Sequence, residues 1–567
     1  MTKILSIGFI LFLGANSWAQ RQKKVQFIGG ARSLMTHTDF KSESNDTTTA
    51  PKTNSGYALF DFGVKINPNQ NTEVVGMFRI NNRFGGFWGG GVDFGVRQLY
   101  VRGVAANVLR YQIGNIDYKL TPYTLYNHNP DMLLNSFGTN AVKEDVIDYE
   151  TFYNRDGTWR QQGAAINFGL QFPKAIRSLE VNGFMTRVNP SDFSAVLERL
   201  QGGGNIIIDQ SKWAKVGFNF ISLFDLKGTA NNGHAYRNNV GTMTFDFSYD
   251  QKKFEAGIDG ETGLSSSFFI DTNTNLLSDY FIHTRAYFNL LEPEMDLNFE
   301  LGYLDNGADF RSFGAQSKRV DFNQFNNFYR RFTNDQIIRP LSVFDLYNDP
   351  GLYSTQSQVG VMEYNPSINN ALPYGLATFN RRGVYLGANY SDSLGIIKAS
   401  IKYHALQEIR GQGTLSKKRF NMAALNAEFN LSNWMRWDKN TVFNLGLSVQ
   451  NTARKSDLEF EQIDLNSVMI SAGFDFEVIP KLHILGNYLM FSSKGNDLLP
   501  IRDTDGSILN FAEYQVDGME QNIAGGLKFD FSKNIYLTAF YEQNTNRFIT
   551  GLPYKYNQFS IYYVMKI

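Results

Sequence analysis

The chain has 567 residues, and its 54 basic and 54 acidic side chains give a formal net charge of zero at pH 7. It contains no cysteine, which excludes disulfide scaffolds and thiolate-bound metal or iron–sulfur sites. Aromatic residues reach 15%, which argues against disorder. The absence of a basic excess argues against binding driven by nucleic-acid phosphates.

Residues 1–19 have the pattern of a secretory signal peptide. Lys3 precedes a short apolar stretch, and the small residues Ser17 and Ala19 occupy the −3 and −1 positions of a cleavage site. We therefore expect a mature chain that starts at Gln20 and works outside the cytoplasm.

The rest of the chain alternates apolar and polar residues with a period of two, the pattern of β-strands. No later stretch offers 18 consecutive apolar residues, so a membrane-spanning helix is not expected. A closed barrel can still cross a bilayer, because only alternate residues of its strands need to be apolar. The clearest alternating segments are 58–66, 164–172, 468–476 and 523–531.

The tripeptide Phe-Asp-Phe recurs near the ends of predicted strands. It stands at 60–62, 245–247, 474–476 and 529–531. Two Phe on one face close to a turn predict an aromatic girdle at a membrane interface, with Phe60, Phe62, Phe474, Phe476, Phe529 and Phe531 facing lipid. The Asp between each pair should then point into a polar interior. A soluble β-sandwich with a Phe-rich core is the alternative.

The connections between alternating segments differ in length at the two ends of the predicted barrel. Short polar turns are expected near 67–71, 250–252 and 532–534. Long loops are expected at 118–160, 305–382 and 493–520. Short periplasmic turns and long extracellular loops are typical of outer-membrane barrels, and pairing across the turns predicts about 20 strands, within a range of about 16–22. Segment 189–239 does not divide cleanly into strands.

The last segment, 559–567, places Phe559, Ile561 and Tyr563 on one face and Ser560, Tyr562, Val564 and Lys566 on the other. Together with the signal-like start and the Phe/Tyr-rich strands, it resembles a porin-like β-barrel of the Gram-negative outer membrane, in a style similar to those of Bacteroidota. The resemblance implies one transmembrane antiparallel barrel over 20–567 and outer-membrane lipid as its surroundings. Other envelope proteins or a second copy of the chain are further candidate partners. One departure is the terminal Ile567, where such barrels usually end in an aromatic residue.

The sequence offers little for catalysis or for metal binding. Its six histidines are scattered, and we expect no enzyme activity, no cofactor and no metal site. Asp271, Asn273, Asn275 and Asp279 match part of a calcium loop, but Leu276 and Ile282 replace the required Gly and Glu, which favours an ordinary polar loop.

Segment 305–382 is far longer than an ordinary loop and interleaves arginine with phenylalanine. It is predicted either to fold into the barrel and narrow it or to form an extracellular cap without a gating role. On the strands, Arg79 and Arg110 lie on the face opposite the apolar residues and should face the lumen, because arginine on the lipid face costs about 2–4 kcal/mol. The facing of Arg97 and Arg102 is ambiguous. The candidate lumen or constriction residues are Arg79, Arg110, Arg311, Arg319, Arg330, Arg331 and Arg339.

The function that these patterns favour is a porin-like channel for the passive passage of small solutes. A barrel of this size has a lumen too wide for side chains to fill, so it must hold water, a loop or a partner. An arginine row can select anions, although ordinary lumen charges balanced by Asp and Glu give the same pattern. The alternative function is a structural or accessory subunit of an outer-membrane assembly or secretion complex, with long loops blocking its lumen.

Overall fold

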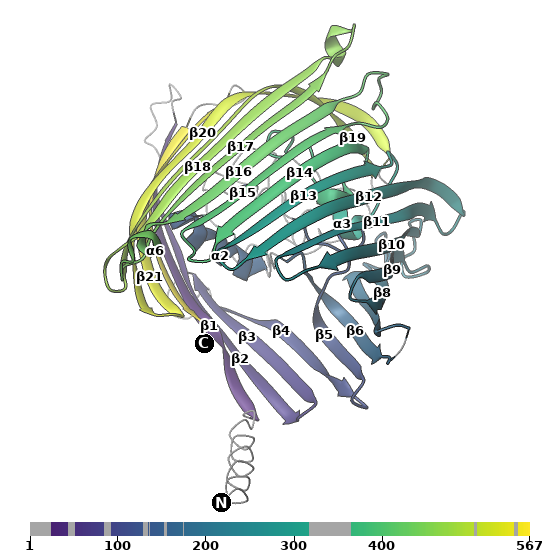
Figure 1. Cartoon of the computed structure of the whole chain (residues 1–567), viewed down its shortest axis with the longest axis horizontal. Helices are drawn as coiled ribbons and strands as arrows, with labels where there is room; N and C mark the ends of the chain where they lie inside the picture. Colours follow the sequence, from purple (N-terminus) through teal and green to yellow (C-terminus); the bar gives the residue numbers. More distant parts are fainter. Residues whose placement is uncertain are drawn as a thin grey trace, which may run out of the picture.

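The computed structural model describes residues 24–42, 52–83, 92–128, 134, 137–151, 156–173, 175–316, 365–503, 507–548 and 554–566. Across these residues the chain forms one 22-stranded antiparallel sheet, which closes into a barrel because β1 pairs with both β2 and β22 (Figure 1). The all-β antiparallel barrel is confirmed, and 22 strands lie at the upper end of the predicted range. The predicted signal segment 1–19 lies outside the described residues.

The strands follow one another around the barrel in chain order. The first eleven are β1 (Val25–Ser42), β2 (Lys52–Asn69), β3 (Thr72–Arg83), β4 (Val92–Ala105), β5 (Leu109–Tyr118), β6 (Trp159–Gln171), β7 (Ser178–Asn189), β8 (Arg199–Ser211), β9 (Ala214–Asp225), β10 (Tyr236–Asp250) and β11 (Phe254–Phe269). The others are β12 (Thr274–Glu292), β13 (Met295–Asn306), β14 (Arg381–Asp392), β15 (Ile397–Gln407), β16 (Arg419–Asn430), β17 (Thr441–Arg454), β18 (Ile463–Ile479), β19 (Leu482–Arg502), β20 (Ile508–Ser532), β21 (Ile535–Phe548) and β22 (Tyr554–Lys566).

β4 pairs irregularly with both of its neighbours, β3 and β5, and this affects which side chains face the lumen. Between β3 and β4 the register shifts at Arg97, which has no opposite residue in the ladder. The bulge changes the parity of β4, so that both Arg97 and Arg102 point inward. β4 pairs with β5 only from Tyr100 to Ala105. Gly114, at φ +104°, ends that pairing, and a side chain there would collide with the Leu99 carbonyl.

The barrel has one end with mainly short connections, called here the short-turn end, and an opposite long-loop end. Residues 70–71, 212–213, 293–294, 480–481 and 533–534 each join two strands at the short-turn end. The longest connections, 119–158 and 307–380, leave from the long-loop end.

The expected long loop at 493–520 is wrong. β19 continues to Arg502 and β20 begins at Ile508, so these strands form a long hairpin. Its alternation is weak because polar residues occupy both faces. Segment 189–239 contains β8, β9 and the start of β10, and its first strand was obscured by the glycine run 202–204.

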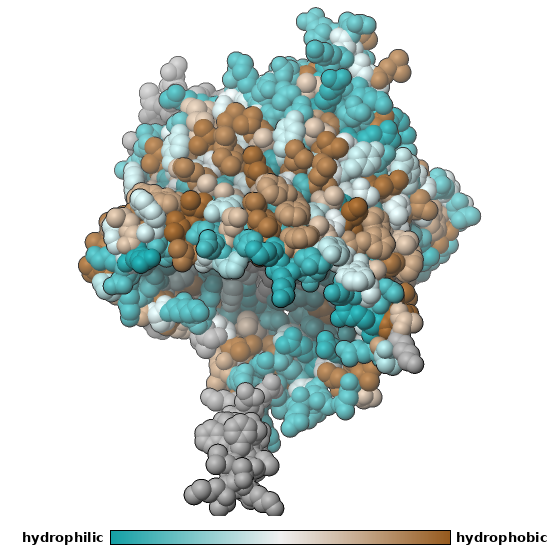
Figure 2. All heavy atoms as spheres, viewed as in Figure 1, coloured by the Kyte–Doolittle hydropathy of each residue, from teal (hydrophilic) through white to brown (hydrophobic). Residues whose placement is uncertain are grey.

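The outer face of the barrel is apolar over the middle of the strands. Figure 2 shows the hydrophobic residues gathered on the outer wall, with hydrophilic residues at its upper edge. The six phenylalanines of the Phe-Asp-Phe repeats named above are 36–49% exposed on this face, whereas Asp61 is fully buried inside. Their predicted outward facing is therefore confirmed. Such a surface is the one that a bilayer-spanning barrel presents to lipid.

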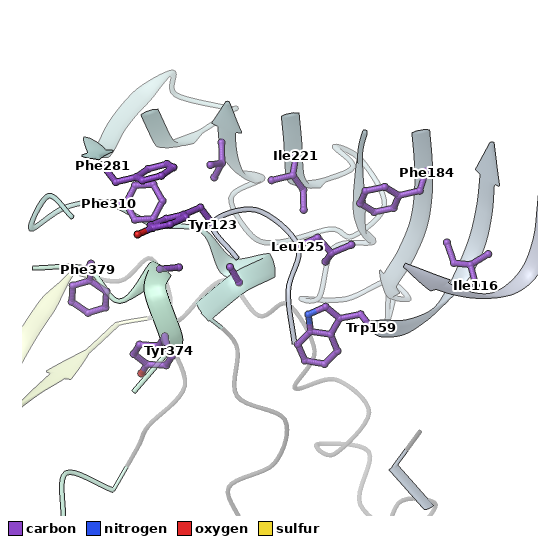
Figure 3. Close-up of a cluster of buried hydrophobic side chains, with 13 residues drawn as sticks. Ile116, Tyr123, Leu125, Trp159, Phe184, Ile221, Phe281, Phe310, Tyr374 and Phe379 are labelled. Atoms are coloured by element: carbon purple, nitrogen blue, oxygen red, sulfur yellow. The ribbon is translucent and has the colours of Figure 1, made fainter. Parts of the chain in front are cut away.

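Three segments between strands lie inside the barrel and pack against its inner wall. They are the described residues between 119 and 158, with helix α2 (Gly138–Thr151), residues 307–316 with the short helix α3 (Phe313–Gln316), and residues 365–380 with the 3₁₀ turn η1 (Gly375–Ala377). Where they meet β5–β12 they form an apolar core that includes Tyr123, Leu125, Phe310 and Tyr374 (Figure 3). The Tyr123 ring stacks on Phe281 of β12 at 3.9 Å between centroids.

Two short elements lie outside the lumen, helix α6 (Leu431–Met435) between β16 and β17 and the 3₁₀ turn η2 (Glu459–Glu461) between β17 and β18. No helix among the described residues combines the length and the hydropathy needed to cross a bilayer.

Candidate functional site

Helix α2 is fixed at its C-terminal end by a buried cluster of charges on β2, β3 and β4. The Asp61 carboxylate accepts two hydrogen bonds from Arg79, each 2.6 Å long, and lies 3.3 Å from Nε of Arg97. The hydroxyl of Tyr149, on α2, donates to the same carboxylate. The guanidiniums of Arg97 and Arg32 lie 4.1 and 4.7 Å from the Tyr149 ring centroid. The cluster therefore holds α2 against the wall.

The middle of α2 is held by β21 and β22. Buried Lys143 forms an ion pair with Glu542 of β21, and Asp145 accepts from Lys566 of β22 at 3.1 Å. Burial lowers the pKa of Lys143, and the Glu542 carboxylate opposes that shift. Val142 packs with Leu485 among apolar residues of the inner wall.

The described residues between 119 and 158 thus contact widely separated parts of the inner wall. Tyr123 lies beside β12, Leu134 lies in a cluster with β18 and β19, and Lys143 reaches β21. Tyr149 then reaches β2, and the chain re-enters the sheet at Trp159. A loop that follows the wall in this way narrows the lumen without depending on any strand pairing.

The second infolded layer contains Arg311, which was predicted in the lumen. Its guanidinium donates to the carbonyls of Ala308 and Phe310 and lies 4.0 Å from the Phe379 ring centroid. Burial, with Arg502 nearby, lowers the pKa of Arg311 to about 9, so the group stays charged at pH 7. Arg311 is 1% exposed and therefore serves packing within this layer rather than contact with a passing solute.

Below these layers, near the short-turn end, the inner wall opens into two polar cavities. One, of about 360 Å³, lies over β12–β16; the other, of about 520 Å³, lies over β2–β7. We call them the amide cavity and the arginine cavity. Both fall in the size range of small-molecule pockets, about 300–1,000 Å³.

The arginine cavity contains Arg110, the predicted lumen residue of β5, together with Arg102 of β4. Arg102 binds Glu73 at 2.8 Å, and Lys65 binds the same carboxylate at 2.6 Å. Arg110 is exposed to the cavity and has no acidic partner among the described residues. It is therefore the predicted arginine best placed to contact a solute.

The arginines predicted to line the lumen lie in different surroundings. Arg79 and Arg110 both face the lumen, but the first is buried in the α2 anchor and the second is open. Arg319, Arg330, Arg331 and Arg339 lie outside the described residues. Sequence reasoning missed the infolding of 119–158, for which its Tyr residues and Trp159 were the available signal, and it missed the asparagine rows of the inner wall.

The histidines do not assemble a metal site. His283 and His404 flank Tyr385, whose hydroxyl lies 2.8 Å from Nε2 of His283. No group of three or more metal-ligating side chains occurs within the part of the chain that the structure describes.

No protein-family model and no curated protein matches the chain. Among solved structures it is similar to Pseudomonas aeruginosa OccK5 (OpdH), at 10% identity and a TM-score of 0.34 over 96% of this chain and 98% of that one. It is also similar to the outer membrane channel DcaP of Acinetobacter baumannii, at 9% identity and 0.26 over 96% and 97%. A third is the FrpB iron transporter of Neisseria meningitidis (F5-1 variant), at 9% and 0.42 over 95% and 82%. Scores this low define no family for the chain, so its function has to be inferred from its own geometry.

Proposed function

We propose that the protein is a porin-like channel of the bacterial outer membrane that lets small solutes pass passively. The carrying observation is the contrast across its wall: the outer face is apolar, and the inner face carries two polar cavities at the short-turn end, each large enough to hold water. Closed barrels with this arrangement conduct when their lumen is wide enough to hold water.

The infolded segments set the size limit of the proposed channel. They line the inner wall from the long-loop end and, beside β21 and β22, reach Lys566 near the short-turn end, so only the space that they leave can carry solute. Residues 1–19 would act as the cleaved signal, and outer-membrane lipid would surround the barrel. Solutes would pass through the barrel without being chemically changed.

A liposome-swelling assay with uncharged solutes of increasing size tests this function. Proteoliposomes containing the purified barrel should swell in small solutes and stop swelling above a sharp size limit. Swelling no faster than that of protein-free liposomes, with a barrel that still shows heat-modifiable migration, would contradict the proposal.

The internal apolar core favours a second candidate, a structural or accessory subunit of an envelope assembly. Tyr123, Phe310 and Trp159 pack as tightly as residues in a soluble core, each at 1% exposure or less. If this packing closes the lumen, the barrel is silent and its role lies in its partners. Co-purification with other envelope proteins, combined with no swelling, would support that function.

A further inference from the structure

The inner wall of the amide cavity carries a row of asparagines on three neighbouring strands. Side-chain hydrogen bonds link Asn389 of β14 to Asn298 of β13 and Asn298 to Asn289 of β12, and all of them run in the same direction. The Asn389 amide donates to Asn298 at 3.2 Å, Asn298 donates to Asn289, and Asn289 donates to Glu255 at 3.0 Å. We call these three residues the amide row.

The row faces the lumen rather than lipid. Each asparagine alternates with an apolar residue on the outer face, such as Phe288 and Phe299, which are 39% and 47% exposed. All three asparagines line the cavity of about 360 Å³ and remain at least partly exposed. The row lies a few residues above the short-turn end, where β12, β13 and β14 begin or end.

Hydrogen bonding within the row leaves more than half of its donor and acceptor positions open. A side-chain amide has two N–H donors and an oxygen with two acceptor positions. Each of the three nitrogens uses one N–H in the relay, and the Asn389 oxygen accepts from no group among the described residues. The amides of the row therefore each keep an open N–H and open acceptor positions, and neighbouring amides are spaced by the strand separation of about 4.8 Å.

The charges around the row do not favour an anion. Lys398 binds Glu428 at 3.0 Å, and Asp296 is the remaining charged side chain of the lining. An anion would meet the Asp296 carboxylate and lose hydration without gaining an opposite charge. A hydroxyl both donates and accepts through one atom, so it matches the open positions of amides best.

We propose that the amide row is a binding subsite for an uncharged, hydroxyl-rich solute of monosaccharide size, placed at the short-turn mouth. This inference rests on the proposed channel function and names the solute class that this part of the lumen selects. The cavity volume, at the low end for small-molecule pockets, fits a single ring rather than a chain.

A second asparagine row lies on β6, β7 and β8. Its position, at a similar height above the short-turn end, supports the proposal that solutes bind at this height in the barrel. Asn167 of β6 donates to Asn182 of β7, which donates to Asn205 of β8 at 2.7 Å. Glu180 accepts the second N–H of both donors, at 3.0 and 3.1 Å, so this row has fewer open donors than the amide row. The subsite is therefore assigned to β12–β14.

The test is equilibrium binding of D-glucose to the detergent-solubilised full chain, measured by saturation-transfer NMR, which does not depend on conduction. Asn298→Leu and Asn389→Leu should each raise the apparent Kd for glucose about fivefold, the loss expected from removing one hydrogen-bonding amide. Asn205→Leu is the matched control, because Asn205 faces the lumen from β8 and accepts from Asn182 at 2.7 Å outside the amide cavity. It should leave the Kd unchanged.

Two charged sugars complete the test. Glucuronate should bind more weakly than glucose, and glucosamine no more tightly than glucose. Equal glucose affinity in the wild-type protein and in both row variants would overturn the proposal, as would tighter binding of glucosamine that Asp296→Asn abolishes. Failure of the channel function has a different signature, since it removes swelling and ion steps but leaves glucose binding and its dependence on Asn298 intact.

Discussion

Arg79 and Arg110 face the same lumen from neighbouring parts of the sheet, yet their surroundings differ. Arg79 is 2% exposed and bound twice to Asp61, in a cluster that fixes Tyr149 of α2. Arg110 is open to the arginine cavity, whereas the neighbouring Arg102 is ion-paired with Glu73. A lumen-facing arginine therefore has two uses here, holding an infolded segment or meeting solute, and its partners decide which.

The largest expected effect follows from Asp61→Asn. The substitution leaves the buried guanidiniums of Arg79 and Arg97 facing a neutral amide, and removing one member of a buried charge cluster costs about 3–5 kcal/mol. The temperature at which the folded band disappears in heat-modifiable migration should fall clearly. Asp296→Asn, on the exposed lumen wall, is the control and should not change it. An unchanged transition in Asp61→Asn would mean that the cluster does not anchor the barrel and α2.

Lys143→Met tests the second anchor of α2. The buried Glu542 carboxylate loses its partner, at a cost of up to about 3–5 kcal/mol, and part of that cost is relieved if α2 moves away from the wall. A single cysteine at Asn140 can report this motion, because the chain has no native cysteine. Its labelling rate should rise at least about tenfold, whereas Lys398→Met should not change it. Equal rates in both variants would show that α2 is held by other contacts.

Phe310→Ala should loosen the internal apolar core without disturbing strand pairing. Large-to-small changes at buried aromatic positions cost about 3–5 kcal/mol, which here acts on the infolded layer. Conductance in planar bilayers should rise and become noisier, while heat-modifiable migration is retained. The control is Phe193→Ala on an exposed loop, where the ring is 78% exposed. Identical conductance in the two variants would argue against a role of this core in narrowing the lumen.

The smallest effect is expected at Arg110. Arg110→Gln removes an exposed charge that water and salt screen, so stability should change by less than about 0.5 kcal/mol. The anion-over-cation permeability ratio, measured from the reversal potential in a KCl gradient, should fall about twofold. Arg110→Lys should keep the wild-type ratio. The prediction fails if Arg79→Gln changes selectivity more than Arg110→Gln does while leaving stability intact.

The residues in these tests also show how much of the structure the sequence could predict. The facing of Arg79, Arg110 and the repeated phenylalanines followed from two-residue alternation, since one period fixes every side chain of a regular strand. Arg97 could not be assigned, because a bulge changes parity without a local signal. The contact between Asp61 and Tyr149 could not be predicted for another reason. Tyr149 lies 88 residues away in the sequence, on a segment whose path depends on tertiary packing.

The long loops show the same division. Breaks in the alternation located 118–160 and 305–382 but wrongly predicted a long loop at 493–520. Infolding depends on complementarity between loop and wall that no local pattern encodes. The amide row was missed because its three members lie on different strands and are brought together only by the register of β12, β13 and β14.

Single-channel recording of the purified wild-type chain in planar bilayers tests the central claim most directly. We expect steady ion steps of a size that the infolded segments limit, with Lys143→Met and Phe310→Ala giving larger steps. A folded, heat-modifiable barrel that stays silent in the wild-type form, and conducts only after its internal segments are loosened, would contradict an open channel and leave a plugged barrel.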